Sequence, residues 1–542
     1  MAHTKGLAAA ATTTTGKTED RRALNRKAIP KPWILDPVLL KGLQTPWETS
    51  KNDLMALDLP QKSGILSARE LEITGSYSIH DLLKGLADGQ LTSEEVVTAF
   101  SKRAAIAHQV TNCLTEIFFD KALERARHLD TERSQGKALG PLHGLPVSMK
   151  ECFHVKDIPS TLGLRAFADH VATENSALSS DSENYLFGRT LNPLNTAITA
   201  GGSSGGEGAL VAFRGSPIGV GTDIAGSVRI PALCCGTYGF RPTANRVPYG
   251  GQQSCGTPCL KPVIACAGPL ANSIDALDVF MKSTIGARPA EYDSRAFDLP
   301  WRDVTASSKT SLRIGVVPED PVFPIHPPVK KALADAVQIL QSQGHEIIWL
   351  DADECHVAHA TMTAWALMDL DEGGNDVVKE GGEEIIRSRV RILEEKEKID
   401  WSYLSGIDKS PSLARLAALS VKKAEIIDSW AGMWKRHRLD AAVSVAAQNS
   451  AIEHDEYGMP PYTQFLNLID YPACVMPFGT VQDTGNEEPL VVKQGQSAPA
   501  YNPETLSGAP CSIQVFTQRM RDEECMEAAR EVDRCLRQAA RN

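Results

Sequence analysis

The chain has 542 residues, of which 42% are hydrophobic and 23% are charged, and its formal net charge is −11. These ordinary proportions allow a large buried core in a globular protein. The acidic balance argues against general nucleic-acid binding and against docking on an anionic membrane. No apolar run is long enough to cross a bilayer, so the sequence predicts a soluble, cytoplasmic protein without a transmembrane anchor.

The first 60 residues read as an N-terminal arm that is disordered at first and then extended. Residues 8–17 are a low-complexity stretch rich in alanine and threonine, without the apolar core that a secretory signal needs. Three arginines within residues 21–26 leave a transit peptide open, whereas the two acidic residues directly before them argue against one. The prolines that follow favour an extended arm.

A predicted helix and a short apolar run that ends in a lysine follow the arm. Residues 91–110, LTSEEVVTAFSKRAAIAHQV, carry apolar side chains at helical spacing and predict a helix. Thr92 and Glu95 have the spacing of a capping box at its start. Further on, the segment GLPVSMKE ends a short apolar run with Lys150. Taken alone, Lys150 would be read as an ordinary surface lysine, but the apolar run before it is unlike the surroundings of one.

The most informative stretch is residues 201–231, GGSSGGEGALVAFRGSPIGVGTDIAGSVRIP, which places serines in glycine-dense backbone. Glycine lets the chain adopt strained turns and approach a ligand closely. A serine hydroxyl in such a turn, beside free backbone N–H groups, supplies the nucleophile and the oxyanion hole that acyl transfer needs. The serines of this stretch are Ser203, Ser204, Ser216 and Ser227.

Other interpretations of this stretch fit less well. A phosphate-binding loop would have a lysine directly after its glycines, and none follows here. A dinucleotide fingerprint would follow a clear strand and precede an acidic residue at a fixed distance, which is also not found. A flexible linker would lack the ordered apolar pattern that runs through these residues. Serines in isolation would be ordinary turn residues.

The second half of the chain alternates between strand and helix patterns. Residues 311–320 predict a buried strand, residues 327–351 predict a helix, a cap at Gly344 and a strand, and residues 439–445 predict another strand. This alternation is typical of an α/β fold. The remaining segments predict a solvated charged helix, a polar connection and a closing amphipathic helix, at residues 385–400, 484–504 and 520–540 respectively.

The chain has twelve cysteines, and in a long sequence without a secretory signal they are expected to be free thiols. Cys255 and Cys259 lack a second ligand pair at finger-like spacing, so we expect no zinc site. His143 and His154 flank Lys150, but no G-x-S-x-G elbow supports a Ser–His–Asp triad, and both are expected to be structural. No metal or organic cofactor is expected.

Residues 201–232 closely resemble the signature of the amidase signature family, which includes fungal amidases and fatty-acid amide hydrolases. The resemblance begins at about residue 60 and implies a single α/β amidase-signature domain over residues 61–542, with a mixed, mostly buried central sheet covered by helices. Other similar segments follow the family order: LHGLPVSMKECF (142–153), DSENYLFGRTLNP (181–193), CCGTYGFRPT (234–243), AGPLANSIDALD (267–278) and SGAPCSIQVFTQR (507–519).

The resemblance also implies a Ser–Ser–Lys triad. Ser227 would attack the amide carbonyl, Ser203 would pass protons to the leaving nitrogen, and Lys150 would be the base. The family has a cis peptide bond before the serine that corresponds to Ser203. Lys150 can accept a proton only when neutral, so burial has to lower its pKa. The implied oxyanion hole consists of Ser203, Ile224, Ala225, Gly226 and Ser227. The implied supporting residues are Ser204, Thr222, Asp223 and Arg229.

The sequence departs from the family within residues 170–188. Relatives have a helix and an apolar strand there, whereas this chain has no strand-like apolar run between Phe167 and Tyr185. A parallel strand needs a crossover of about a dozen or more residues, so loss of this unit near residues 178–181 would remove a strand from the sheet. An error in the gene model, favoured by the intact flanking motifs, and a real loss are both open, and either puts activity in question.

The sequence therefore predicts an amidase that cleaves a carboxylic amide to an acid and ammonia or an amine through an acyl-enzyme. Its partner would be a small-molecule amide, with no nucleic acid involved. The oligomeric state is not readable, and a homodimer stays open. The alternatives are a catalytically impaired chain, an amidotransferase-type subunit, against which the fungal-amidase-like motifs weigh, and an esterase or amide synthase. The sequence does not identify the amide.

Overall fold

The computed structural model describes residues 21–167, 182–252, 256–257, 260–304, 311–371, 373–407, 409–482 and 489–541. Within these residues a separate hairpin joins β2 (Glu183–Asn184) to β3 (Gly188–Arg189). The main sheet has nine strands in the order β1 (Ser148–Met149), β4 (Ile218–Asp223), β6 (Cys266–Ala271), β5 (Tyr238–Arg241), β10 (Ala473–Thr480), β11 (Pro510–Phe516), β9 (Ala441–Val445), β7 (Arg313–Val316) and β8 (Glu346–Trp349).

The main sheet is parallel at its two ends and antiparallel in its middle. β1 runs parallel to β4, and β7 runs parallel to both β8 and β9. In the series β4, β6, β5, β10, β11 and β9, each successive pair of strands is antiparallel. Every residue of β4, β5, β6, β9 and β11 is buried, as expected for strands that are covered on both faces. The predicted α/β fold with a mixed, mostly buried sheet is confirmed.

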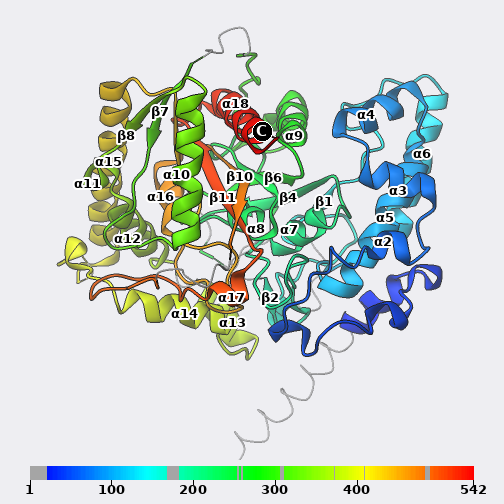
Figure 1. Cartoon of the computed structure of the whole chain (residues 1–542), viewed down its shortest axis with the longest axis horizontal. Helices are drawn as coiled ribbons and strands as arrows, with labels where there is room; N and C mark the ends of the chain where they lie inside the picture. Colours follow the sequence, from blue (N-terminus) through cyan, green and yellow to red (C-terminus); the bar gives the residue numbers. More distant parts are fainter. Residues whose placement is uncertain are drawn as a thin grey trace, which may run out of the picture.

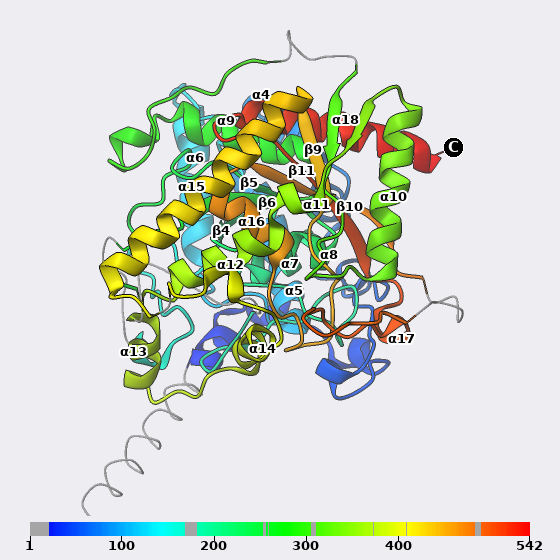
Figure 2. The same cartoon turned by 90° about the vertical axis from the view of Figure 1, so that its left-hand side faces the viewer.

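Helices surround this sheet (Figure 1 and Figure 2). The α-helices are α2 (Leu59–Lys62), α3 (Ala68–Gly75), α4 (Ile79–Asp88), α5 (Ser93–Thr111), α6 (Phe119–Ser134), α7 (Gly205–Ala212), α8 (Arg229–Cys235), α9 (Ile274–Gly286), α10 (Pro327–Ser342), α11 (Ala352–Cys355), α12 (Val357–Met368), α13 (Gly373–Glu380), α14 (Arg387–Lys396), α15 (Ser412–His437), α16 (Pro461–Ile469), α17 (Pro503–Leu506) and α18 (Asp522–Arg541). Short 3-10 helices span Lys31–Trp33, Pro37–Leu40, Trp47–Thr49, Arg165–Phe167, Pro289–Glu291 and Ser402–Leu404.

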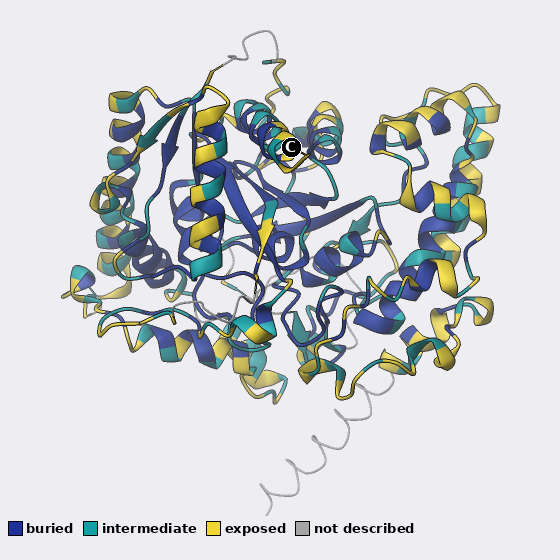
Figure 3. Ribbon diagram, in the orientation of Figure 1, coloured by how far each residue is buried: buried dark blue, intermediate teal, exposed yellow. Residues whose placement is uncertain are grey.

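Different groups of helices lie at the two ends of the sheet, and the last helix, α18, packs against α9 and β10 between them. The N-terminal helices α2 to α6 gather at the end that carries β1, and α11, α12 and α15 lie at the end formed by β7 and β8 (Figure 1). The strands in the middle are buried, whereas the outer surfaces of the helices are exposed (Figure 3). The sheet therefore keeps β1 and β4, which carry the candidate site, away from the β7–β8 end.

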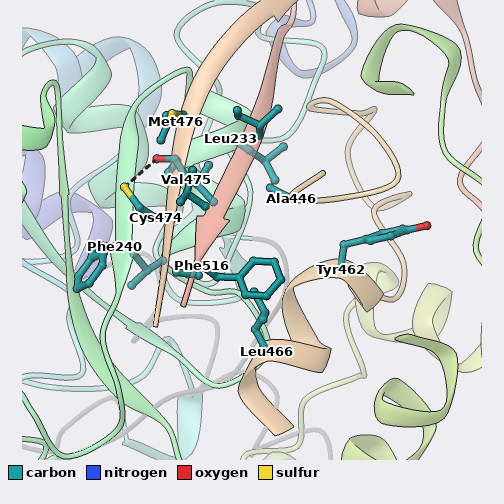
Figure 4. Close-up of a cluster of buried hydrophobic side chains, with 14 of the residues drawn as sticks. Leu233, Phe240, Ala446, Tyr462, Leu466, Cys474, Val475, Met476 and Phe516 are labelled. Atoms are coloured by element: carbon teal, nitrogen blue, oxygen red, sulfur yellow. Dashed lines mark hydrogen bonds between the residues drawn. The ribbon is translucent and has the colours of Figure 1, made fainter. Parts of the chain in front are cut away.

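A cluster of buried side chains joins the middle of the sheet to the helices beside it (Figure 4). Phe516 of β11 packs edge-on against Phe465 of α16 and Trp430 of α15, with ring centroids 5.9 and 5.7 Å apart. Leu466 of α16 faces the same cluster (Figure 4). This packing fixes α16 against the sheet, which matters because α16 also contacts the candidate site.

The described part of the N-terminal arm is packed rather than merely extended. Leu54 and Leu59 are fully buried in a cluster shared with α5. The Gln109 side chain of α5 accepts from the Leu35 N–H and donates to the Trp33 carbonyl, both at 2.9 Å. These contacts hold the first 3-10 helix, Lys31–Trp33, and Leu35 against α5. The first 20 residues of the predicted arm lie outside the described residues.

The strongest periodic patterns gave correct elements. The predicted helix at 91–110 is α5, and the Thr92 hydroxyl accepts from the Glu95 N–H at 3.0 Å. The reciprocal half of the capping box is missing, because the Glu95 carboxylate pairs with Arg69 instead, at 3.2 Å. The helix–strand unit at 327–351 is α10 followed by β8, and Gly344 between them has a φ of 91°.

The expectation that residues 385–400 form a solvated helix is wrong in one respect. α14 does lie in this range, but one of its faces is buried. On that face Arg391 and Glu395 pair at 3.0 Å, with side chains 7% and 1% exposed. The Glu395 carboxylate also accepts from the Met459 N–H at 2.6 Å. A buried ion pair with a backbone partner lets a charged helix pack against the protein.

The cysteine prediction is confirmed for the residues that the structure describes, where every cysteine is a buried free thiol. Cys255 and Cys259 lie outside the described residues. The segment expected to lack a helix–strand unit also lies mostly outside them, since 168–181 are not described. Within the described residues, β1 pairs only with β4 and forms one edge of the sheet, and β2 joins no strand but β3.

Candidate active site

Ser227 lies in a tight turn between the end of β4 at Asp223 and the start of α8 at Arg229. Gly226 in this turn has a φ of 130°, a conformation that other residues rarely adopt. A Cβ on Gly226 would also collide with Thr463 Oγ1. Only glycine fits at this position, and the turn holds Ser227 between two buried elements of the fold.

Lys150 follows β1 directly, and both its backbone and its side chain are hydrogen-bonded to β4. Its backbone N–H donates to the Val220 carbonyl at 2.8 Å. Its Nζ donates to Thr222 Oγ1 at 2.8 Å and to Ser203 Oγ. Lys150 is 8% exposed, and burial lowers the pKa of its ammonium below the usual value. The prediction that this lysine is buried is confirmed.

Ser203 and Ser204 lie in the turn that leads into α7. The peptide bond between Gly202 and Ser203 is cis, as the family resemblance implies. The Ser204 N–H donates to the Ser227 carbonyl at 3.2 Å, and Ser204 Oγ accepts from the Thr222 N–H at 3.3 Å. These bonds hold the Ser203 turn against both the Ser227 turn and β4.

Asp223 and Arg229, at the two ends of the Ser227 turn, form an ion pair with no exposed side-chain surface. Arg229 Nε donates to Asp223 Oδ2 and Nη2 donates to Oδ1, each at 3.0 Å. The same guanidinium donates to Gln514 Oε1, the Thr463 carbonyl and Asn467 Oδ1. Burial alone would raise the pKa of Asp223, but Arg229 outweighs burial and lowers it to about 2. Asp223 is therefore a fixed carboxylate.

The carboxylate of Asp223 also organises the backbone of the turn. It accepts from the Gly226 N–H at 2.9 Å and from the Val228 N–H at 3.3 Å. The Gly226 N–H, which the resemblance assigns to the oxyanion hole, is thus engaged within the protein. Three other N–H groups of the turn make no hydrogen bond within the described residues, namely those of Ile224, Ala225 and Ser227.

The structure joins Lys150, Ser203 and Thr222 through their side chains, whereas the Ser227 carbonyl accepts from the N–H of Ser204, the neighbour of Ser203. Ser227 is 6% exposed. Its hydroxyl makes no hydrogen bond to any residue that the structure describes, and it is not among the fully enclosed polar atoms that lack a partner. The hydroxyl is therefore buried in a turn but retains some access to its surroundings.

A cavity of about 370 Å³ lies beside Lys150 and Ser203. Glu207, in the first turn of α7, lines it and is 8% exposed. Burial raises the pKa of the Glu207 carboxyl to about 7, and Lys150 acts in the opposite direction. Sequence reasoning missed Glu207, although an acidic residue inside an apolar, glycine-rich helix is a signal. Much of the remaining wall is apolar and includes Phe100, Leu114, Phe118, Phe119, Val147 and Leu210.

Sequence reasoning also missed the contribution of α16. Thr463 Oγ1 donates to the Ala225 carbonyl at 2.6 Å, and Asn467 Nδ2 donates to Asp223 Oδ1 at 2.9 Å. The two α16 residues are four positions apart and share one helix face. Every residue of α16 is buried, so polar side chains at this spacing in an otherwise apolar helix were the available signal.

One group of potential metal ligands occurs in the described part of the chain, formed by His345, Glu531 and Cys535. His345 Nδ1 accepts from the Leu312 N–H at 3.1 Å. A neutral ring therefore carries its proton on Nε2, which faces Glu531 at 3.4 Å and Cys535 at 3.5 Å. A protonated Nε2 offers no lone pair to a metal, so this group fits hydrogen bonding instead.

Comparison of the sequence with known proteins identifies the family of this chain. The sequence model of the Amidase family matches residues 95–178 and 174–526. An amidase of Gibberella moniliformis is 37% identical over 532 residues, which cover 94% of this chain and 96% of that protein. An acetamidase of Emericella nidulans is 32% identical over 573 residues, which cover 95% of this chain and 97% of that protein.

The similarity extends to solved structures. A fatty acid amide hydrolase superposes with a TM-score of 0.83 at 29% sequence identity, over 96% of this chain and 95% of the other. The two matched ranges overlap at residues 174–178, within the segment where the sequence departs from the family. Among the described helices, none is both long and apolar enough to span a bilayer. From its matched residues and its similarity over nearly its full length, the chain belongs to the amidase signature family and is an amide hydrolase.

Proposed function

We propose that the chain cleaves a carboxylic amide to an acid and ammonia or an amine through an acyl-enzyme on Ser227. The observation that carries this proposal is the buried group in which Lys150 Nζ is hydrogen-bonded to Ser203 Oγ and Thr222 Oγ1. Burial favours the neutral form of this lysine, and a neutral amine beside a hydroxyl can act as a base. We take the roles of Ser203, Ser227 and Lys150 from the family resemblance, and this buried group supports those of Ser203 and Lys150.

In the acylation step, Ser227 Oγ attacks the carbonyl carbon while its proton moves to Ser203 Oγ, and the Ser203 proton moves to Lys150 Nζ. The carbonyl oxygen becomes a negatively charged oxygen in a tetrahedral intermediate. When the C–N bond breaks, the proton returns from Lys150 through Ser203 to the leaving nitrogen. Water then attacks the acyl-enzyme through the same relay and releases the acid, which restores the Ser227 hydroxyl.

The intermediate needs hydrogen-bond donors for its negative oxygen. We assign this role to the N–H groups of Ile224, Ala225 and Ser227, because none of them makes a hydrogen bond within the described residues. The Gly226 N–H is engaged by Asp223 and is left out of this assignment. One such donor is typically worth about 3–4 kcal/mol in the transition state.

The other residues of the site act by holding the reacting groups. Thr222 bonds Lys150 Nζ, and Ser204 joins the Ser203 turn to the Ser227 turn. Asp223 and Arg229 hold the Ser227 turn from its two ends. None of these four side chains takes part in bond making or breaking in this proposal.

The test is labelling of the folded chain with a fluorophosphonate, read by intact mass. We expect one adduct on the wild-type chain and none on Ser227→Ala. Ser388→Ala is a matched control, because Ser388 is 3% exposed, lies on α14 and has no hydrogen-bond partner for its hydroxyl. This control is expected to label like the wild type. An adduct that persists in Ser227→Ala would contradict the assigned nucleophile.

One observation favours a second candidate, a catalytically impaired member of the family. β1, which leads into Lys150, is an edge strand of two residues, and the family match falls into two parts that overlap at residues 174–178. A folded wild-type chain that forms no adduct would support this candidate and contradict the proposed activity. Sequencing the transcript across residues 170–188 would then separate a gene-model error from a real loss.

A further inference from the structure

The peptide unit that joins Ala225 to Gly226 is held from two sides. Its carbonyl accepts from Thr463 Oγ1 at 2.6 Å, and its N–H donates to Asp223 Oδ1 at 2.9 Å. The carbonyl and the N–H of a trans peptide point in opposite directions in one plane. Two hydrogen bonds from opposite sides therefore fix the rotation of this plane about the chain.

The orientation of this plane affects the groups on either side of it. Rotating the plane would change ψ of Ala225 and φ of Gly226 together. The N–H of Ala225 lies just before the plane, and the N–H of Ser227 lies just after it. Both belong to the set that we assign to the oxyanion, so a loose plane would leave these donors without a fixed direction.

Thr463 is itself held firmly enough to serve this purpose. It is fully buried on α16, and its carbonyl accepts from Arg229 Nη2 at 2.9 Å. The carbonyl of its neighbour Tyr462 accepts from Gln514 Nε2 at 2.6 Å. One turn further along α16, Asn467 donates to Asp223 Oδ1 at 2.9 Å. α16 is thus bonded to both ends of the Ser227 turn and to β11.

The Thr463 side chain also touches the turn directly, because a Cβ on Gly226 would collide with its Oγ1. The hydroxyl therefore lies against the most unusual backbone position of the turn. Its bond to the Ala225 carbonyl is shorter than its bond to the Pro460 carbonyl within its own segment, 2.6 against 3.2 Å. The contact to the turn is the stronger of the two by distance.

We propose that Thr463 is a positioning residue for the reaction: its hydroxyl holds the Ala225–Gly226 peptide so that the neighbouring N–H groups face the oxyanion. This inference rests on the function proposed above and adds a residue more than 230 positions away from the turn in sequence. Thr463 touches neither the scissile bond nor the attacking oxygen, and it acts through the backbone of the turn.

The test compares three variants of the full chain. Thr463→Val keeps the shape of the side chain and removes the hydroxyl, and Thr463→Ser keeps the hydroxyl. Thr361→Val is the matched control, because Thr361 is also fully buried in a helix, α12, and its hydroxyl donates to the Val357 carbonyl at 2.8 Å. Each variant is assayed for the saturating fluorophosphonate labelling rate and for hydrogen–deuterium exchange of the peptide that covers residues 224–228.

For Thr463→Val we expect the saturating labelling rate to fall about 10- to 100-fold, less than the 10²- to 10³-fold loss that follows removal of a whole oxyanion donor. The half-saturating probe concentration should change little. Exchange at residues 224–228 should become about fivefold faster, as expected for one lost hydrogen bond. Thr463→Ser and Thr361→Val should both behave like the wild type in the two assays.

The two readouts separate this inference from the proposed function. If the wild type does not label, the proposed function fails, and the exchange measurement still decides whether Thr463 holds the turn. Unchanged exchange and labelling in Thr463→Val would overturn the inference. Equal losses in Thr463→Val and Thr463→Ser would also overturn it, because the hydroxyl would then not be the group that matters. A labelling loss in Thr361→Val as large as in Thr463→Val would overturn it as a general packing effect.

Discussion

Replacing Arg229 with methionine would leave Asp223 as a buried carboxylate without its cation. Both side chains have no exposed surface, so water does not replace the lost partner. Arg229 also donates to Gln514, Thr463 and Asn467, which would lose a hydrogen-bond donor at the same time. Methionine fills a similar length with flexible apolar atoms, so the change removes the charge more than the packing.

The expected cost follows from the burial of the pair. Removing one partner of a buried ion pair typically destabilises a protein by about 3–5 kcal/mol. Because three further acceptors lose a donor, we expect the upper end, about 5 kcal/mol, for Arg229→Met. Adding Asp223→Asn removes the unpaired negative charge of the buried carboxylate. The double variant should therefore be more stable than Arg229→Met alone at neutral pH.

The pH dependence of the free energy of unfolding gives a second expectation, with a definite direction. In the wild type, the pKa of Asp223 is lowered from 3.8 to about 2, so its contribution is present above pH 4 and is lost as the pH falls toward 2. In Arg229→Met, the largest cause that opposes burial is gone, so burial shifts the pKa of Asp223 upward against the smaller effects of Arg241 and Asn467. The variant should then gain stability as acid protonates Asp223, and the gap between the single and double variants should narrow below neutral pH.

Urea unfolding of the wild type, Arg229→Met and the double variant, measured between pH 5 and pH 8, tests this reasoning. A single variant within about 1 kcal/mol of the wild type would refute it, since surface changes alone reach that range. So would a double variant that is no more stable than the single variant at pH 7. Either result would mean that Asp223 finds another partner or that water reaches it.

Two further predictions concern the proton relay. Lys150→Met should slow acylation by about 10²- to 10⁴-fold. Lys150→Arg should not restore the rate, because a guanidinium stays protonated. Single-turnover labelling measures both variants, and rescue by arginine would count against the role of Lys150 as the base. Glu207→Gln should move the acid limb of the pH profile of kcat/KM to lower pH, because the Glu207 charge raises the pKa of Lys150. An unmoved acid limb would show that the two groups do not interact.

Much of the fold was predictable where the chain has strong periodicity or local chemistry. α5, α10, β9 and the glycine-rich turn around Ser227 follow from patterns within short segments. Lys150 and Ser203 were predicted through the motifs that surround them, and the structure brings their side chains together. These successes share one property, which is that the deciding contacts are encoded by residues close in sequence or by a family motif.

The predictions that failed, and the residues that sequence reasoning missed, depend on partners that are distant in the chain. Glu95 had the spacing of a capping box, but Arg69 competes for its carboxylate. The charged residues of α14 hid a buried face, because the Glu395 carboxylate on that face accepts from the distant Met459 N–H only after the chain folds. Thr463 looked like any threonine in an apolar helix until α16 packed against the Ser227 turn.

The pairing of β1 with β4 has a consequence for the tolerance of the site to change. Ser148 pairs with Gly219 and Met149 with Val220, and the Lys150 side chain then reaches Thr222, two positions further along β4. The register of β1 against β4 thus sets where the Lys150 side chain lies along β4, and a slip of one residue would move it by about 3.3 Å. Main-chain bonds set that register, so the exposed Met149 side chain, which also lines the cavity, can change the cavity wall without moving the base.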